Sequence, residues 1–359
     1  MARVGLIFGG RTVEHQVSLT SARAVAAALR QAGHEVVSFG VAEDGCWLEP
    51  EAAAPALCGK LERLPAVGQP VAGTLVHLID SGVEVLFPIV HGTWGEDGSL
   101  QGLCEMLDLP YVGAGVAASA VAMDKVLCKR VLASAGLPVV EYAAIGAAEF
   151  EAAPERAREL LPDRPPPLFV KPSRGGSSVG IRRVGDRAEL PEAVRFALTF
   201  DREALVERGV SGRELECSVL GHSAPEASAI GEIVPANEFY DYEDKYLQDE
   251  AELIYPADLP GPLSDELRRL AVAAYRAIGA SGMARVDFLL EDGNTPWINE
   301  INTLPGFTQI SMYPKLWDVL GLGMPELMDR LLAAAFERHA ERRALDAGIR
   351  AWLDELESD

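Results

Sequence analysis

The chain has 359 residues, of which 48% are hydrophobic and 24% are charged, with a formal net charge of −22 at pH 7. This length predicts two or three domains, and no apolar run reaches the roughly 18 residues that a membrane span requires. The negative charge argues against a nucleic-acid partner, since such binding needs a basic face. The five cysteines lack metal-type spacing and are odd in number, which argues against a disulfide framework and favours a cytoplasmic protein.

Strands and helices alternate in the first third of the chain. The predicted elements are strands at 3–8, 34–41 and 83–90 and helices at 18–31 and 100–107. Alternation of this kind is typical of a parallel sheet with helices on both faces. The loop at 9–15 follows the first strand, where ligands bind such sheets, and Ser18 is the expected cap of the next helix.

The rest of the chain contains helices and antiparallel strands. A helix follows Met123-Asp124-Lys125 and ends at Ser134, and residues 146–167 predict a surface helix and a linker. The later predicted strands are 168–171, 179–183, 204–207, 214–220 and 227–234, and the later helices are 189–198, 264–278 and the segment after Pro325.

Residues 169–180 contain a glycine- and serine-rich loop between two predicted strands. Backbone N–H groups in such a loop approach phosphate closely, and Lys171 before it adds a positive charge. We therefore expect this loop and Lys171 near a phosphate group, although an ordinary hairpin loop has the same composition. The run at 113–118 matches the loose dinucleotide fingerprint, but the strand before it is too short to favour a nicotinamide site.

Two other loops follow predicted strands. Residues 91–98 hold three glycines and two acids, and we expect His91 near a ligand, although capping of the next helix explains the acids equally well. In residues 303–312, the N–H groups of Gly306 and around Ser311 suit an oxyanion or a carboxylate. A simple helix cap at Ser311 is the alternative.

Residues 238–246 crowd three tyrosines with charged side chains inside a long polar loop. Long loops in compact domains are usually functional lids or disordered segments, and the aromatic content argues against disorder. We therefore predict a lid that contains Lys245 and Tyr246.

Residues 285–302 carry the most informative pattern. A turn signal at 291–294 separates two apolar runs, which predicts a β-hairpin. With Gly293 and Asn294 at the tip, four polar side chains point to one face of the sheet. These are Arg285 opposite Asn302 and Asp287 opposite Glu300. Carboxylate and amide oxygens suit Mg²⁺ or Mn²⁺, whereas the alternative is a salt-bridged surface.

Seven blocks occur in a distinctive order. They are Gly-Gly-x-x-x-Glu-His at 9–15, His-Gly-x-x-Gly-Glu-Asp-Gly at 91–98, Met-Asp-Lys at 123–125, Val-Lys-Pro with Gly-Ser-Ser-Val-Gly at 170–180, Tyr-Asp-Tyr-x-x-Lys-Tyr at 240–246, Arg-x-Asp at 285–287 and Asn-Glu-Ile-Asn-Thr-x-Pro-Gly at 299–306. This series closely resembles the D-alanine:D-alanine ligase family.

The resemblance implies a multidomain α/β and α+β protein with the ATP-grasp fold, in which ATP lies between two α+β domains. We expect a Rossmann-like, parallel-sheet substrate domain at 1–118 and a small ATP-grasp subdomain at 119–209. A C-terminal ATP-grasp domain at 210–359 would hold the metal site and the terminal helices.

The resemblance also implies the nucleotide and metal contacts. The residues near ATP would be Lys125, Lys171, Ser177, Ser178 and Lys245 for the phosphates, with Glu207 and Glu214 near adenine and ribose. Two Mg²⁺ or Mn²⁺ ions would be held by Asp287, Glu300 and Asn302, with Glu300 bridging them.

The resemblance implies the contacts with the two substrate molecules as well. Glu14, linked to Ser177 and Tyr246, would receive the ammonium of the first D-alanine, and His91 would lie nearby. Arg285 and the Gly306 N–H would stabilise an oxyanion. Ser311 and the Met312 N–H would hold the carboxylate of the second D-alanine.

The implied activity is the ATP-dependent synthesis of D-alanyl-D-alanine for peptidoglycan through an acyl phosphate, by a homodimer. One alternative is a ligase of the same family that joins D-alanine to D-lactate or D-serine, and Tyr246 argues against the lactate type. The other is a nucleotide-binding regulator without turnover. Such a regulator could lose its metal ligands, whereas Asp287, Glu300 and Asn302 are all present.

Overall fold

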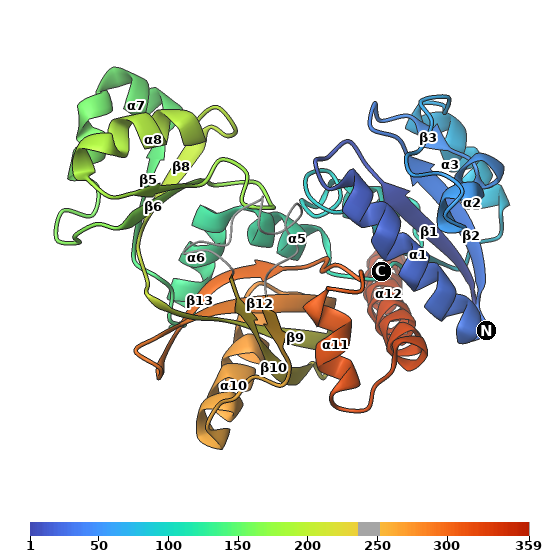
Figure 1. Cartoon of the computed structure of the whole chain (residues 1–359). Helices are drawn as coiled ribbons and strands as arrows, with labels where there is room; N and C mark the ends of the chain where they lie inside the picture. Colours follow the sequence, from blue (N-terminus) through green and yellow to red (C-terminus); the bar gives the residue numbers. More distant parts are fainter. Residues whose placement is uncertain (236–251, 359) are drawn as a thin grey trace.

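The computed structural model describes residues 1–235 and 252–358. The strands in these ranges form three sheets, which lie in the N-terminal, central and C-terminal parts of the chain. Figure 1 shows the N-terminal and central sheets on opposite sides of the molecule, with the C-terminal sheet below and between them. No helix in the described ranges combines the length and the apolar character needed to cross a membrane.

The N-terminal sheet is mainly parallel, as the sequence predicts. Its strands are β1 (Arg3–Gly9), β2 (Glu35–Val41), β3 (Trp47–Leu48) and β4 (Val85–Ile89), in the order β3-β2-β1-β4. The strand β1 pairs in parallel with both β2 and β4, and β3 adds an antiparallel edge.

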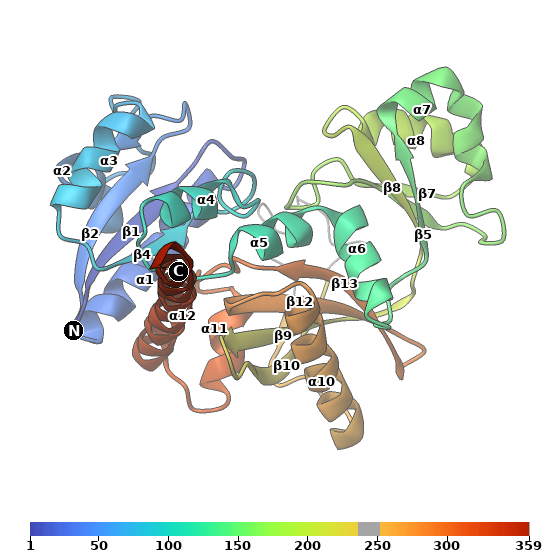
Figure 2. The same ribbon diagram turned by 180° about the vertical axis from the view of Figure 1, so that it is seen from behind.

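Helices cover both faces of this sheet (Figure 2). They are α1 (His15–Gln31), α2 (Pro50–Leu57), α3 (Val71–Asp80) and α4 (Ser99–Met106). Along β1, Leu6 and Phe8 belong to the core that includes α1 and α2, whereas Ile7 belongs to the core that includes α3 and α4. This alternation follows from the period of two along a strand.

The expected cap at Ser18 is wrong. Helix α1 begins one turn earlier, at His15, and Ser18 lies inside it with no exposed surface. Its Oγ accepts a hydrogen bond from the Gly9 N–H at 2.7 Å and donates one to the Ile89 carbonyl. A serine near the start of a helix can cap the helix, or it can bond to buried backbone groups of neighbouring strands. The sequence alone does not distinguish these two roles.

The central sheet is antiparallel, with strand order β5-β8-β6-β7. Its elements are β5 (Tyr142–Gly146), α7 (Ala147–Ala152), η1 (Pro154–Glu159), β6 (Leu168–Pro172), β7 (Arg182–Val184), η2 (Arg187–Glu189), α8 (Leu190–Ala197) and β8 (Glu203–Arg208). The strand expected from 179 begins only at Arg182. Residues just before it, Ser177, Ser178 and Gly180, have φ angles of 52°, 57° and 79°, which strands do not adopt.

The C-terminal sheet is antiparallel and presents two different faces. Its strands are β9 (Gly212–Gly221), β10 (Glu226–Val234), β11 (Glu252–Ile254), β12 (Gly282–Glu291) and β13 (Thr295–Asn302), in the order β11-β10-β9-β12-β13. Val286, Phe288 and Leu290 of β12 are buried against α5 (Val116–Met123), α6 (Lys125–Ser134) and α10 (Gly261–Ala277). Arg285 and Asp287, at the alternate positions of the same strand, face the other way, into a cavity.

The base of the hairpin formed by β12 and β13 has the predicted register. Arg285 pairs with Asn302, and Asp287 pairs with Glu300. All four residues line the same cavity, so the prediction that they share one face is confirmed.

The tip of this hairpin differs from the prediction. Glu291 pairs with Thr295, which leaves a loop longer by one residue than the expected two-residue turn, with Gly293 at a φ of 74°. A β-bulge beside Asp287 then places Asn299 as an extra residue in β13. The longer loop and the bulge shift the register in opposite directions, so the base pairs as expected.

Packing crosses the expected domain limits. Residues 114–132, with α5 and α6, pack into the core of the C-terminal sheet, and a backbone bond joins Pro138 to Ile298. The end of the chain forms α11 (Met312–Asp318) and α12 (Met324–Ser358), as the predicted terminal helix suggested. The first turns of α12 pack against α1 and the N-terminal sheet. The limits at 118 and 209 stay a prediction.

Candidate active site

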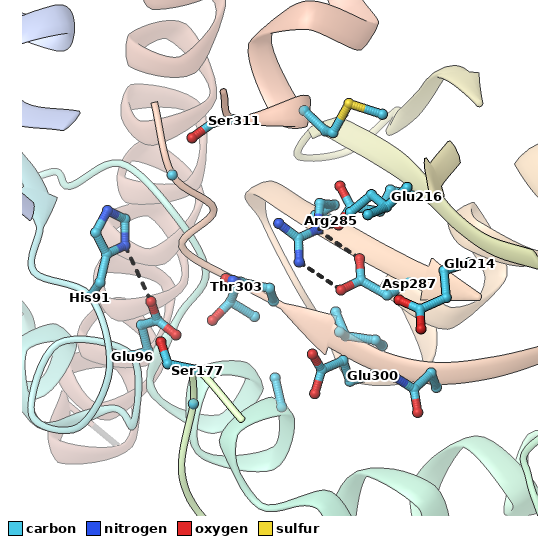
Figure 3. A pocket seen from close by; sticks show the side chains of 18 of the residues that line it. His91, Glu96, Ser177, Glu214, Glu216, Arg285, Asp287, Glu300, Thr303 and Ser311 are labelled. Atoms are coloured by element: carbon cyan, nitrogen blue, oxygen red, sulfur yellow. Dashed lines mark hydrogen bonds and ion pairs between the residues drawn. The ribbon is translucent and has the colours of Figure 1, made fainter. Parts of the chain in front are cut away.

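A cavity of about 250 Å³ lies where the N-terminal domain, the glycine-rich loop and the C-terminal sheet meet. Its polar lining includes Glu14, His91, Glu96, Lys125, Ser177, Glu214, Glu216, Arg285, Asp287, Glu300, Asn302 and Ser311 (Figure 3). A smaller cavity of about 100 Å³, lined by Lys171 and Ser178, shares Lys125, Ser177, Glu214 and Glu300 with it. The structure thus brings together most of the predicted site residues.

Arg285 is held between two carboxylates. Its Nε and Nη2 donate to the two Asp287 oxygens at 2.7 and 2.6 Å, and Nε lies 3.2 Å from Glu216 (Figure 3). Burial lowers the pKa of Arg285, but Asp287 and Glu216 raise it more, so the net shift is upward. The guanidinium therefore stays charged inside the cavity, where a positive group can stabilise negative charge on a substrate.

The carboxylate of Glu14 lies where two glycines allow close approach. Ser177 Oγ donates a hydrogen bond to it, which joins the glycine-rich loop to the N-terminal domain. A Cβ added at Gly92 would lie 2.7 Å from Glu14 Oε2, and one added at Gly176 would lie 3.2 Å from it. Gly92 also has a φ of +78°. Larger residues at these positions would displace a carboxylate that is suitable for binding an ammonium group.

His91 is buried beside a second carboxylate. Its Nδ1 lies 3.1 Å from the Leu304 carbonyl and 3.4 Å from Glu96. The alternative that Glu96 caps the next helix is not observed, because Gly98 occupies the N-cap position without a side-chain bond. Asp97 accepts from the N–H groups of Trp94 and Ser99 at 2.8 and 3.0 Å, and Ser99 is the first residue of α4, so the capping alternative holds for Asp97.

The loop after β13 is fixed by its own side chains. Asn302 Oδ1 accepts from the Leu304 N–H at 2.9 Å, and Ser311 Oγ accepts from the Thr308 N–H at 2.9 Å. Ser311 is the N-cap residue of α11, but its side chain makes no capping bond. A Cβ at Gly306 would lie 2.7 Å from Ser311 Oγ, so only glycine fits here without movement.

Glu207 forms a buried ion cluster that the sequence did not predict. Its carboxylate lies 2.6 Å from Lys129 Nζ and 2.5 Å from Lys171 Nζ. Burial raises the pKa of Glu207, but the two ammonium groups lower it by more, so the net pKa is about 2. Glu207 thus holds Lys171 at the edge of the smaller cavity.

We expect this cluster to give the protein a pH-dependent stability between pH 4.5 and pH 2. The folded-state pKa of Glu207 is about 2 against an ordinary value of 4.5. Its contribution is therefore complete above pH 4.5 and is lost as the pH falls through 2, a change of about 3 kcal/mol in the free energy of unfolding. Urea unfolding of wild type and Glu207→Gln at several pH values measures it. Equal pH slopes in the two proteins would contradict the prediction.

The donor set fits a divalent cation of the Mg²⁺ or Mn²⁺ type. Asp287, Glu300 and the amide of Asn302 supply oxygen atoms in one cavity, and Glu214 lines the same space. Within residues 1–235 and 252–358, no three His, Cys, Asp or Glu side chains cluster closely enough to hold a metal ion by themselves. Asn302 adds an amide oxygen to this lining, and the metal site stays a prediction.

Some site residues lay outside the sequence prediction. Glu216 follows Glu214 by two positions on β9, so the period of two placed it on the cavity face. Lys129 and Ser21 act through contacts with residues distant in sequence, Glu207 and Phe307, and no local pattern signals them. The expected lid residues Lys245 and Tyr246 lie outside the described residues.

Comparisons with known proteins agree with this geometry. A model described as D-ala D-ala ligase N-terminus matches residues 3–114, and one described as D-ala D-ala ligase C-terminus matches residues 131–333. A D-alanine–D-alanine ligase of Solibacter usitatus is 48% identical over 95% of this chain and 97% of its own length. The D-alanine–D-alanine ligase A of Escherichia coli is 44% identical, over 96% and 98%.

Solved structures give the same result. The D-alanine-D-alanine ligase from Coxiella burnetii has a TM-score of 0.78 and 33% identity, covering 99% of this chain and 98% of that one. The VanG D-Ala:D-Ser ligase from Enterococcus faecalis has a TM-score of 0.78 and 31% identity, covering 93% and 99%. The multidomain ATP-grasp fold is thereby confirmed, and the chain belongs to the D-alanine–D-alanine ligase family.

Proposed function

We propose that this protein joins two D-alanine molecules to D-alanyl-D-alanine with ATP, for peptidoglycan synthesis. The observation that carries the proposal is the convergence in one cavity of a carboxylate for an ammonium group, Glu14, a charged donor for an oxyanion, Arg285, and a lysine for phosphate, Lys125. Relatives with 40–48% identity over nearly the whole chain are named D-alanine–D-alanine ligases, which supports the same substrate.

The reaction proceeds in two steps. A carboxylate oxygen of the first D-alanine attacks the γ-phosphorus of ATP, and ADP leaves, which converts a poor electrophile into an acyl phosphate. The amine of the second D-alanine then attacks the acyl carbon, loses a proton and expels phosphate. Phosphoryl transfer requires mainly positioning and charge neutralisation, for which Lys125 and Lys171 face the adjoining cavities.

Charge develops on the acyl oxygen in the second step. Arg285 and the Gly306 N–H are the donors that we assign to this oxygen, and Ser311 with the Met312 N–H to the carboxylate of the second D-alanine. Glu14, held by Ser177, binds the first ammonium, with His91 beside it. These assignments explain why the cavity combines both signs of charge.

Two divalent ions complete the proposal. Asp287, Glu300 and Asn302 would hold them. The ions would supply positive charge to the phosphate oxygens of ATP. Ser178 and Lys245 would contact the same phosphates, Glu214 and Glu207 would lie toward the nucleoside, and Tyr246 would close the site as part of a lid against water.

The choice of second substrate is tested directly. VanG, whose structure this chain matches, is a D-Ala:D-Ser ligase, so D-serine is the main alternative, and D-lactate is the other. We expect phosphate release from ATP and Mg²⁺ with D-alanine alone. Mixed ligation, in which D-alanine is joined to D-serine or D-lactate, should be slower. Equal or faster mixed ligation at neutral pH would overturn the D-alanine assignment, and no D-alanine-dependent phosphate release would overturn the ligase proposal.

We further propose a cytoplasmic homodimer, with a second copy on an exposed face of α12. The apolar side chains of this face are Leu345, Ile349, Trp352, Leu353 and Leu356, all exposed. The exposed apolar surface carries this proposal, since Arg342 at the start of the face is already paired with Asp108 at 2.8 Å.

Sedimentation velocity tests the homodimer. Trp352→Glu should convert a dimer into a monomer, while Val67→Glu, an exposed residue elsewhere, should not. A monomeric wild type, or a Trp352→Glu variant that stays dimeric, would contradict this interface.

A further inference from the structure

Ser21 links helix α1 to the loop after β13. Its side chain is fully buried, and its Oγ accepts a hydrogen bond from the Phe307 N–H at 3.1 Å. The same oxygen lies 3.1 Å from Nε2 of His91, whose Nδ1 lies 3.1 Å from the Leu304 carbonyl. Two side chains of the N-terminal domain therefore hold both ends of the short segment that contains Gly306.

The chemistry of the groups fixes the direction of these bonds. A backbone N–H only donates and a carbonyl only accepts, so Nδ1 of His91 carries a proton that it gives to Leu304. In a neutral imidazole, Nε2 is then an acceptor, and it receives the hydroxyl proton of Ser21. If Nε2 were protonated, it would donate to Ser21 Oγ, and no other described residue would accept the hydroxyl proton.

The segment held in this way presents the Gly306 N–H. No described residue accepts a hydrogen bond from this group. A Cβ at Gly306 would lie 2.7 Å from Ser311 Oγ and 3.8 Å from Ser21 Oγ, so the segment is closely packed. Oxyanion donors are effective when they are aimed in advance at the oxygen that gains charge.

We propose that Ser21 is a positioning residue that aims the Gly306 N–H through Phe307 and keeps His91 neutral and protonated on Nδ1. The inference rests on the proposed function, because that function directs the Gly306 N–H to the acyl oxygen. Ser21 acts through His91 and the loop, without contact to the reacting atoms.

The charged groups that face His91 make this arrangement sensitive to pH. Burial lowers the pKa of His91, but the carboxylates of Glu96 and Glu14 raise it more, so the net shift is upward. The Ser21 hydroxyl opposes protonation because it donates to Nε2. Removing the hydroxyl takes away the only hydrogen-bond donor that the described residues offer to Nε2, so the neutral ring with its proton on Nδ1 loses this contact.

Ser21→Ala tests the proposal, with Ser18→Ala as a matched control. Ser18 lies one turn earlier on α1, is equally buried and bonds to two backbone groups, but those belong to the N-terminal sheet. We expect Ser21→Ala to lower kcat about 10- to 100-fold and to displace the acidic limb of the kcat–pH profile, because His91 loses its partner at Nε2. KM for ATP should change by less than about 2-fold, and Ser18→Ala should lose stability without moving that limb.

A second measurement does not depend on the variant. In ¹⁵N NMR spectra of the wild-type protein, His91 should show protonated Nδ1 and unprotonated Nε2 at pH 8. A protonated Nε2, or a Ser21→Ala enzyme with unchanged kcat and pH profile, would overturn the inference. Failure of the wild-type enzyme to ligate D-alanine would instead overturn the proposed function, and the NMR result would still report on the contact between Ser21 and His91.

Discussion

Replacing Arg285 by lysine should lower kcat for dipeptide formation by about 10²- to 10³-fold, the usual effect of removing one oxyanion donor. Lysine keeps a positive charge near Asp287 and Glu216, but it cannot reproduce the two parallel bonds to Asp287 at 2.7 and 2.6 Å. The lysine side chain is also shorter, and its ammonium group lacks the planar pair of N–H donors of a guanidinium. Steady-state kinetics with D-alanine measure the effect.

The control for this variant is Arg213→Lys. Arg213 lies on β9 of the same sheet and makes a similar two-bond pair with Glu232, at 2.7 and 2.6 Å, outside the cavity. Its replacement should leave kcat within about 2-fold and reduce stability by about 1 kcal/mol. If both lysine variants lose activity equally, the role of Arg285 in the oxyanion site is wrong.

Asp287→Asn should lower kcat/KM by at least about 100-fold and raise the Mg²⁺ concentration needed for half-maximal activity. The substitution keeps the size of the side chain and one acceptor oxygen but removes the negative charge that a divalent ion requires. It also leaves Arg285 with Glu216 as its charged partner at 3.2 Å. Titration of Mn²⁺ followed by electron paramagnetic resonance measures metal affinity without turnover.

Glu232→Gln is the matched control for Asp287→Asn, since it removes the carboxylate of the second arginine pair. We expect unchanged Mn²⁺ affinity for Glu232→Gln and weaker binding for Asp287→Asn. Unchanged ligation by Asp287→Asn would show that this carboxylate does not serve the metal site.

The sequence predicts the fold well where a pattern is local. The alternation of strands and helices gave the parallel N-terminal sheet, and the hairpin gave the pairing of Asp287 with Glu300. The hairpin also shows a limit, because the loop at Gly293 and the bulge at Asn299 cancel each other and neither is visible in the spacing of the polar residues. Without the bulge, the longer loop would shift the pairing by one residue and turn Glu300 and Asn302 away from the cavity.

The remaining features depend on contacts between distant segments. Lys129 reaches Glu207 from α6, whose apolar side chains pack in the core of the C-terminal sheet, and Ser21 contacts Phe307 across 286 positions of sequence. Ser18 and Ser21 lie three residues apart on one helix, yet Ser18 bonds to the N-terminal sheet and Ser21 bonds to the loop after β13. Sequence patterns alone do not separate these two roles, since both serines are simply polar residues on a buried helix face.

The transfer of a labelled oxygen tests the acyl-phosphate mechanism most directly. D-Alanine labelled with ¹⁸O in its carboxyl group is incubated with the enzyme, ATP and Mg²⁺, and the released phosphate is analysed by mass spectrometry. Because a carboxylate oxygen attacks the γ-phosphorus and leaves with it, each phosphate should carry one ¹⁸O for each D-alanyl-D-alanine formed. Unlabelled phosphate, or pyrophosphate as the product, would contradict ligation through an acyl phosphate in this cavity.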